Sequence, residues 1–306
     1  RVTIYADRKR NGRFLLIGSG SPSIMDIVSE SLAGRLGMVR MTPFLLPELK
    51  VAQMDDLWLR GGYPDGGILD PDMFPEWQEN YLEALATRDL PNWGLPARPR
   101  LTLRLLAMLA ASHGQPLNAS QIGGSLALNH KTVLSYIDFL EGAFLVRRLP
   151  PYFANIRKRL VRTPKLYFVD TGVLCHLLGI RSAADLRTHP SRGAIFENWV
   201  VSEAMKGRLH HGLDANLFFF RDRSGHEVDL LLESAGRITA VETKAGATIG
   251  RDFLDGLRWF EALASERFPQ DRVETVLVHG GEQAGSMHGT TLLPWSGVGA
   301  FDWPAA

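Results

Sequence analysis

Cysteine is nearly absent from the sequence, since Cys175 is the only one in 306 residues. This excludes a disulfide framework and a zinc site built from cysteine, and it is typical of a protein from a reducing compartment. No apolar run reaches the roughly 18 residues of a membrane helix. A signal peptide is not expected either. These absences predict a cytoplasmic protein without a membrane as partner.

A charge excess of one sign is also missing from the chain as a whole, which has 34 Lys and Arg against 33 Asp and Glu. Between Arg98 and Lys165, however, eleven basic residues face two acidic ones, Asp138 and Glu141, an excess of nine positive charges. Such a basic stretch between near-neutral flanks is typical of a surface that contacts nucleic-acid phosphates. A solvated positive face without a ligand is the alternative.

The length predicts two domains or three small ones, and strand and helix patterns together predict an α/β fold class. Near the start we expect a strand at Arg13–Gly18, a helix at Ile24–Leu36 and another strand at Met38–Leu45. Prolines 91, 96 and 99 then indicate a linker. We therefore place the domains at residues 1–95, 96–150 and 151–306.

The middle domain shows a helix-turn-helix pattern. Helices are expected at Leu101–His113, Asn118–Ser125 and Lys131–Glu141, followed by a strand at Phe144–Leu149. This order is typical of a winged helix-turn-helix, whose last helix enters a DNA major groove. The side chains expected to contact DNA are His130, Lys131, Thr132, Ser135, Arg147 and Arg148. Winged helices also serve as protein–protein modules, which is the alternative.

The last domain carries the residues that suggest chemistry. Two apolar strands, Glu227–Glu233 and Ile238–Lys244, flank a turn at Ser234–Arg237. This turn places Glu233 opposite Ile238, and therefore Asp229 opposite Glu242. Opposed carboxylates in an otherwise buried sheet repel each other unless a cation or a shared proton lies between them. A hard divalent ion, Mg²⁺ or Mn²⁺, is the predicted occupant.

Two further residues complete this hypothesis. Glu197, on a helix predicted at Gly193–Lys206, supplies a third carboxylate for the metal. Lys244 lies two residues beyond Glu242 and so on the same face of the strand, where it can orient or help to deprotonate the water that attacks a phosphodiester. The alternative is an ordinary ion pair between Glu242 and Lys244, but burying these charges without a role would be costly.

Three passages together resemble the PD-(D/E)XK nuclease superfamily: Ala194–Val200, His226–Leu232 and Val241–Lys244. The resemblance is greatest to the C-terminal domain of unknown function of a large bacterial and archaeal AAA-type ATPase family. It extends over most of the chain through the passages Gly12–Ser19, Ser29–Arg35, Leu59–Pro64, Thr87–Leu90, Leu145–Pro151 and Lys165–Gly172. It implies a partial AAA ATPase core with a lid-like helical region, a winged helix and a restriction-endonuclease-like domain, in that order.

The resemblance also implies roles for single residues. Glu197, Asp229, Glu242 and Lys244 match the nuclease signature. Ser19 ends a strand similar to the sensor-1 strand, near an ATP γ-phosphate, and Arg88 is similar to a sensor or finger arginine. Many ATPases of this kind assemble, so a homo-oligomer is one expected state.

The sequence departs from that family because it contains no GxxxxGK[ST] phosphate-binding loop. ATP binding and hydrolysis are therefore expected only in a longer parent chain. The preferred hypothesis is a DNA-binding protein that cleaves DNA phosphodiesters with Mg²⁺ or Mn²⁺. The alternatives are a non-catalytic DNA- or protein-binding regulator, and an ATPase whose activity resides in a longer parent chain.

Overall fold

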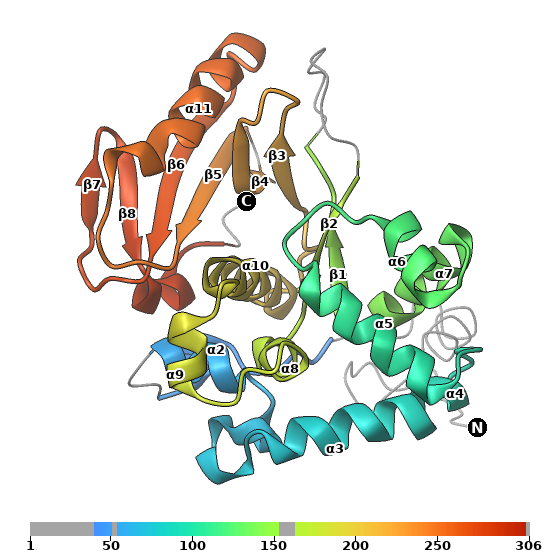
Figure 1. Ribbon diagram of the computed structural model, residues 1–306. Coiled ribbons are helices and arrows are strands. Elements are labelled where there is room, and N and C mark those ends of the chain that lie inside the picture. Colours follow the sequence, from blue (N-terminus) through green and yellow to red (C-terminus); the bar gives the residue numbers. More distant parts are fainter. Residues whose placement is uncertain (1–39, 51–53, 153–162, 235, 304–306) are drawn as a thin grey trace, which may run out of the picture. The chain divides into compact units, whose positions relative to one another are not determined.

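The computed structural model describes residues 40–50, 54–152, 163–234 and 236–303 (Figure 1). Helices and strands are mixed along these residues, and the fold class is α/β, as the sequence predicts. The predicted strand at Arg13–Gly18, the helix at Ile24–Leu36 and Ser19 lie outside the described residues. No helix in the described part of the chain is both long and apolar enough to cross a membrane.

The helices of the described residues are α2 (Met54–Arg60), α3 (Glu76–Ala84), α4 (Leu90–Asn92), α5 (Pro99–Ala111), α6 (Ala119–Leu126), α7 (His130–Gly142), α8 (Thr171–Leu177), α9 (Ala183–Thr188), α10 (Arg192–His210) and α11 (Asp255–Arg267). The strands are β1 (Val146–Leu149), β2 (Lys165–Phe168), β3 (Leu217–Arg221), β4 (Glu227–Ser234), β5 (Arg237–Lys244), β6 (Arg272–His279), β7 (Gly285–Met287) and β8 (Thr290–Pro294). Short helical turns occur at Leu46–Glu48, Pro64–Ile68, Pro71–Met73, Leu85–Asp89, Arg251–Leu254 and Trp295–Ala300.

A mixed sheet in the order β3-β4-β5-β6-β8-β7 forms the C-terminal part. Neighbouring strands pair antiparallel from β3 to β5, and β6 pairs parallel with both β5 and β8. Leu230 and Val241 join the hydrophobic cluster that contains the buried face of α10, whereas Leu231 and Ala240 join the cluster of α11. The sheet thus lies between two helices, as Figure 1 shows, because its strands are apolar on both faces.

In the middle part, helices α5, α6 and α7 and strand β1 follow one another in the predicted order. Asn118 accepts a hydrogen bond from the backbone of α6 and Asn129 from that of α7, so both helices begin at a capping side chain. Val133 and Ile137 of α7 are buried in the core. The chain then forms an antiparallel hairpin, β1 with β2, which crosses the predicted boundary between residues 150 and 151. Residues 37–306 form one unit, and β2 connects its helical part to its sheet part.

The strand predicted at Met38–Leu45 is wrong for the residues that are described, because residues 40–45 form no strand. Phe44 N donates to Gly62 O rather than to a sheet neighbour, and Pro43 and Pro47 carry no N–H to donate. Leu45 is buried and Phe44 half-buried in this loop, whereas Met41 is 87% exposed. The apolar run therefore indicated burial of only some of its residues and did not indicate the secondary structure.

The passages Leu59–Pro64 and Lys165–Gly172, for which no site role was predicted, pack against each other. Asp170 accepts a hydrogen bond from Gly62 N (2.7 Å) and caps α8 at Val173 N (2.9 Å). Gly61 has a φ of +73°, and a Cβ there would overlap the Asp170 carboxylate. A Cβ on Gly172 would likewise overlap the backbone of Arg60. These glycines allow α2 and α8 to approach closely, and the two passages hold the fold together.

A candidate carboxylate site at the ends of two strands

The hairpin of β4 and β5 has the predicted register, with Glu233 opposite Ile238 and Leu230 opposite Val241. The ladder ends at the second of these pairs. One position further, the Asp229 carboxylate accepts hydrogen bonds from Thr243 N (2.9 Å) and Thr243 Oγ1 (2.8 Å). Asp229 is 9% exposed and takes the place of a strand acceptor where β4 and β5 separate. Its position is therefore fixed by the sheet itself.

Glu242 and Lys244 lie on the same face of β5, as the alternation of strand side chains predicts. Lys244 Nζ is 2.5 Å from Glu242 Oε1, and it lies 5.5 Å from the centre of the Phe253 ring. The ion pair is half-buried, with Glu242 13% and Lys244 33% exposed. The Glu242–Lys244 ion pair that was the alternative to a catalytic site is thus present. The residues around it decide whether these two side chains have a further role.

The structure adds residues that sequence reasoning missed, and they come from β2, β3 and β4. Lys165 Nζ lies 2.8 Å from Glu197 Oε1 and 2.7 Å from Glu227 Oε1, and its side chain is only 2% exposed. Tyr167 OH donates to the same oxygen of Glu197 at 2.5 Å. Arg221 Nε is 3.5 Å from Glu227 Oε2. The alternation of Lys165 and Tyr167 was the available signal, because residues two apart share a strand face.

We call the group Glu197, Glu227, Asp229, Glu242, Lys165 and Lys244 the carboxylate site. Burial, and after it the charge of Asp229, raises the pKa of Glu197 to about 7. Burial and the charge of Asp229 also raise the pKa of Glu242, although Lys244 opposes this. The three predicted carboxylates are therefore close enough to repel one another. Such repulsion is what a bound cation would relieve.

Burial acts in the opposite direction on the two lysines. It lowers the pKa of Lys244, but the contact with Glu242 outweighs burial, and the pKa lies above its usual value. Burial is likewise the largest influence on Lys165, and Tyr167, Glu197, Asp229 and Glu227 together raise its pKa well above the usual value. Both lysines are therefore ammonium ions at neutral pH.

The predicted three-carboxylate metal set is not arranged as a ligand group. In the part of the chain that the structure describes, no three His, Cys, Asp or Glu side chains are placed to hold one metal ion. Glu197 faces Lys165 and Tyr167 instead. Asp229 and Glu242 fit a smaller site, because Mg²⁺ is commonly held by one or two carboxylates and keeps several waters. Such an ion prefers carboxylate oxygens as ligands, and it would relieve the repulsion between these two carboxylates.

The residues predicted to contact DNA divide into two classes. His130, Lys131 and Ser135 are exposed on α7, whereas Thr132 is half-buried at its start.

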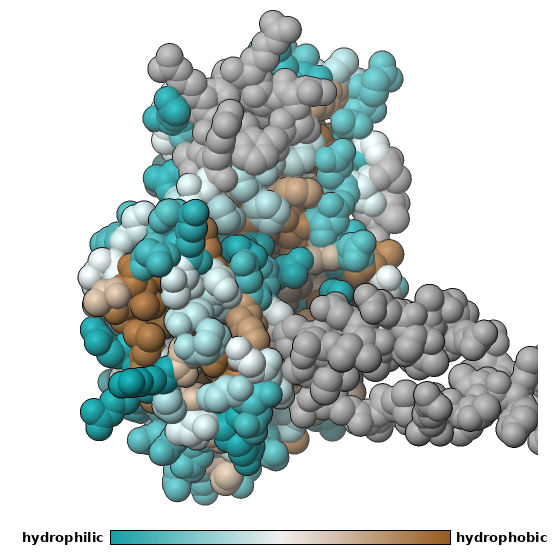
Figure 2. Space-filling view, turned by 90° about the vertical axis from the view of Figure 1, so that its right-hand side faces the viewer, coloured by the Kyte–Doolittle hydropathy of each residue, from teal (hydrophilic) through white to brown (hydrophobic). Residues whose placement is uncertain are grey.

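On the side of the molecule in Figure 2, hydrophobic residues form small separate patches among hydrophilic ones. An extended apolar docking face is therefore not evident in this view.

The two predicted DNA-contacting arginines of β1 are paired with acidic residues. Arg148 forms ion pairs with Asp138 (2.7 Å) and Glu141 (2.6 Å), and Arg147 lies 3.7 Å from Glu141. The two acidic residues of the basic stretch thus neutralise these arginines. Lys165, buried in the carboxylate site, does not contribute to a basic surface either. The excess of nine already counts these two acidic residues, so burial of Lys165 takes one positive charge from it; Arg157, Lys158, Arg159 and Arg162 lie outside the described residues.

Arg88, predicted to approach ATP, lies in the turn Leu85–Asp89 and is 69% exposed. Its guanidinium pairs with the neighbouring Asp89 at 2.7 Å. The hydrogen bond that Arg88 donates to Asp89, together with the charge of Asp89, raises the pKa of Arg88. Ser19, the other residue predicted near ATP, lies outside the described residues. The described residues therefore give no support for the predicted contacts with ATP.

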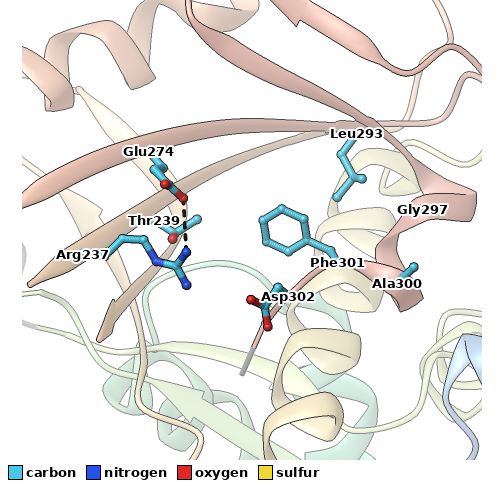
Figure 3. A pocket seen from close by; sticks show the side chains of 8 residues that line it. All are labelled: Arg237, Thr239, Glu274, Leu293, Gly297, Ala300, Phe301 and Asp302. Carbon is cyan, nitrogen blue, oxygen red and sulfur yellow. Dashed lines mark ion pairs between the residues drawn. The ribbon is translucent and has the colours of Figure 1, made fainter. Parts of the chain in front are cut away.

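An open cavity of about 450 Å³ lies elsewhere in the sheet domain. In Figure 3 its lining includes Arg237 and Glu274, which form an ion pair at 3.7 Å, with Phe301 and Asp302 across from them. Arg237 begins β5 and Lys244 ends it, so this cavity is roughly 20 Å from the carboxylate site at the usual rise per strand residue. The cavity is therefore separate from the carboxylate site.

Comparisons with known proteins agree with a division into two parts. Residues 51–184 match the family model "Domain of unknown function (DUF8612)", and residues 192–297 match "Domain of unknown function (DUF4143)". The chain is 36% identical over 238 residues to "Uncharacterized protein Rv2008c" of Mycobacterium tuberculosis and equally to "Uncharacterized protein Mb2031c" of Mycobacterium bovis, covering 77% of this chain and 53% of each relative.

A more distant relative, "Uncharacterized protein" of Haemophilus influenzae, is 22% identical over 190 residues, covering 56% of this chain and 48% of the relative. The chain thus spans about half the length of the curated relatives it matches. No solved structure shows a significant match.

Proposed function

We propose that this chain is a DNA-binding protein whose C-terminal part cleaves DNA phosphodiesters with Mg²⁺ or Mn²⁺. The observation that carries the proposal is the carboxylate site, where burial and, after it, the charge of Asp229 raise the pKa of both Glu197 and Glu242. A set of buried carboxylates with too few cations of its own favours a divalent ion. The resemblance of these residues to the PD-(D/E)XK nucleases supports the same assignment.

Asp229 and Glu242 would hold the ion, and Lys244 would act beside them. A bound divalent ion supplies positive charge to the phosphate oxygens and lowers the pKa of water. Hydrolysis joins the water oxygen to phosphorus and breaks one P–O ester bond. The water loses a proton, and the leaving oxygen gains one. Since Lys244 is an ammonium ion, its role is to orient water and to stabilise charge on the phosphate, not to accept the proton.

DNA binding is proposed for the middle part of the chain. Helices α5 to α7 and the β1–β2 hairpin follow the order of a winged helix, with His130, Lys131 and Ser135 exposed on the helix that would enter the groove. The N-terminal region is proposed as a partial AAA ATPase core, so that ATP binding and homo-oligomer formation would belong to a longer parent chain. Cytoplasmic location is the compartment that fits these activities.

The test is a cleavage assay on supercoiled, linear and branched DNA with Mg²⁺ or Mn²⁺. We expect cutting by the wild type, its loss in EDTA, and a fall of about 100-fold or more for Glu242→Gln and Lys244→Met. Glu274→Gln removes a carboxylate at the far end of the same sheet and should keep full activity. Cutting that survives the first two substitutions would sink the nuclease assignment. Tight DNA binding without any cutting would favour the non-catalytic regulator.

A further inference from the structure

We propose that Lys165 is a built-in cation of the carboxylate site, which holds Glu197 away from the divalent ion and limits the site to one such ion. This inference rests on the proposed function. It changes the predicted role of Glu197, which was that of a third metal ligand. Glu197 becomes a positioning residue, and Asp229 and Glu242 are the side chains left to bind the metal.

Lys165 is held in a way that a surface lysine is not. It is 2% exposed, and its ammonium lies between carboxylates of two different elements, Glu197 of α10 (2.8 Å) and Glu227 of β4 (2.7 Å). Its position on β2 is fixed by the pairing of Leu149 with Lys165 in the β1–β2 hairpin. A buried ammonium with two carboxylate partners occupies the kind of place that a metal ion would otherwise take.

One oxygen of Glu197 is held by two partners. Oε1 accepts from Lys165 Nζ and from Tyr167 OH, at 2.8 and 2.5 Å. The neighbouring Asn198 donates to Phe168 O at 2.8 Å, which joins α10 to β2 beside this contact. The helix and the strand therefore move as one piece, and Glu197 cannot turn toward a metal without breaking this contact.

The charge of the site also favours a single ion. Its four carboxylates face three cationic side chains, Lys165, Lys244 and the Arg221 that pairs with Glu227, so one negative charge remains when all are ionised. One divalent ion changes this to a single positive charge, which matches the single negative charge of a phosphodiester. A second divalent ion would leave three positive charges in a largely buried group, which is costly.

The test is the number of Mn²⁺ ions bound by the full chain, measured by calorimetry and by electron paramagnetic resonance of free Mn²⁺. We expect one ion for the wild type and for Lys165→Arg, which keeps the charge. Lys165→Met frees Glu197 and Glu227 and should bind a second ion. Glu197→Gln should keep the wild-type affinity, whereas Asp229→Asn should weaken it about tenfold or more.

Each result has a distinct meaning. Two ions in the wild type, or a loss in Glu197→Gln as large as in Asp229→Asn, would overturn the role of Lys165 and leave the metal site standing. Absence of Mn²⁺ binding by the wild type would overturn the proposed function as well. If Lys165→Met does not fold, the comparison of Glu197→Gln with Asp229→Asn decides the question, since both substitutions preserve side-chain shape.

Discussion

Helix α10 contributes to two groups of buried charge that differ in their balance. At its start, Glu197 belongs to the carboxylate site. Two turns later, Glu203 and Lys206 form an ion pair at 2.5 Å in which both are about 5% exposed or less. Lys206 also donates to Phe44 O (2.8 Å), and Glu203 accepts from Leu46 N (2.9 Å). We call the ion pair of Glu203 and Lys206 the balanced cluster.

The balanced cluster and the carboxylate beside it, Asp170, are stabilised by the protein itself. Burial raises the pKa of Asp170, but the other contributions to that pKa, from backbone N–H groups and Lys206, lower it. The cavity beside these residues is only about 10 Å³ and has no room for a ligand. In the carboxylate site, by contrast, another carboxylate adds to the effect of burial. Buried charges that protein groups stabilise thus indicate a structural role, whereas buried carboxylates that raise one another's pKa favour a bound cation.

The same substitution in the two groups should have different effects. Glu203→Gln breaks the buried ion pair with Lys206 and should lower the free energy of unfolding by about 3–5 kcal/mol. Glu242→Gln removes a repulsion with Asp229 and leaves a lysine that is 33% exposed, so without metal it should cost less than about 1 kcal/mol. Urea unfolding in EDTA measures both. Equal losses would contradict the distinction between the two groups.

The carboxylate site should also make stability depend on pH. The pKa of Glu197 is raised from 4.5 to about 7 in the folded protein, so its contribution is fully present below pH 4.5 and is lost as the pH rises through 7. The metal-free protein should lose up to about 3 kcal/mol over this range, and Glu197→Gln should flatten the dependence. Thermal unfolding from pH 5 to pH 8 tests this, with Glu274→Gln as the control. A slope unchanged in Glu197→Gln would refute it.

A smaller effect, on DNA binding, is expected to distinguish basic residues with and without carboxylate partners on the proposed DNA surface. Among the described residues no carboxylate lies within ion-pair distance of Lys131, whereas Arg148 has two carboxylate partners. Lys131→Gln should weaken DNA binding and reduce the salt slope by about 1. Arg148→Gln should change stability and leave that slope as it is. Fluorescence anisotropy at several salt concentrations measures it, and the reverse pattern would remove α7 from the interface.

The sequence predicted the local part of the site well. A turn at Ser234–Arg237 sets the register of β4 and β5, and strand alternation places Glu242 and Lys244 on one face. Both rules depend on neighbours within one hairpin, so no distant contact could change them. Glu197 was proposed as a third carboxylate, but its distance from Asp229 could not be predicted, because helix placement depends on the packing of the whole sheet.

The features of the site that could not be predicted are those that depend on contacts between residues far apart in the sequence. Lys165 is 32 residues from Glu197 and 62 from Glu227, and nothing in its own passage predicts that a lysine will be buried. Its strand, β2, was not predicted, so the alternation of Lys165 and Tyr167 was not used. The glycines at 61 and 172 had no assigned role for the same reason, since their partners lie more than 100 residues away.

The carboxylate site, unlike the balanced cluster, is proposed to be completed by a divalent cation. This is tested by the melting temperatures of the wild type and of Asp229→Asn in Mn²⁺ and in EDTA at pH 8. We expect the wild type to be stabilised by about 2.7 kcal/mol at a Mn²⁺ concentration of 100 times Kd, and Asp229→Asn to gain much less. No stabilisation of the wild type, or an equal gain in both proteins, would contradict it.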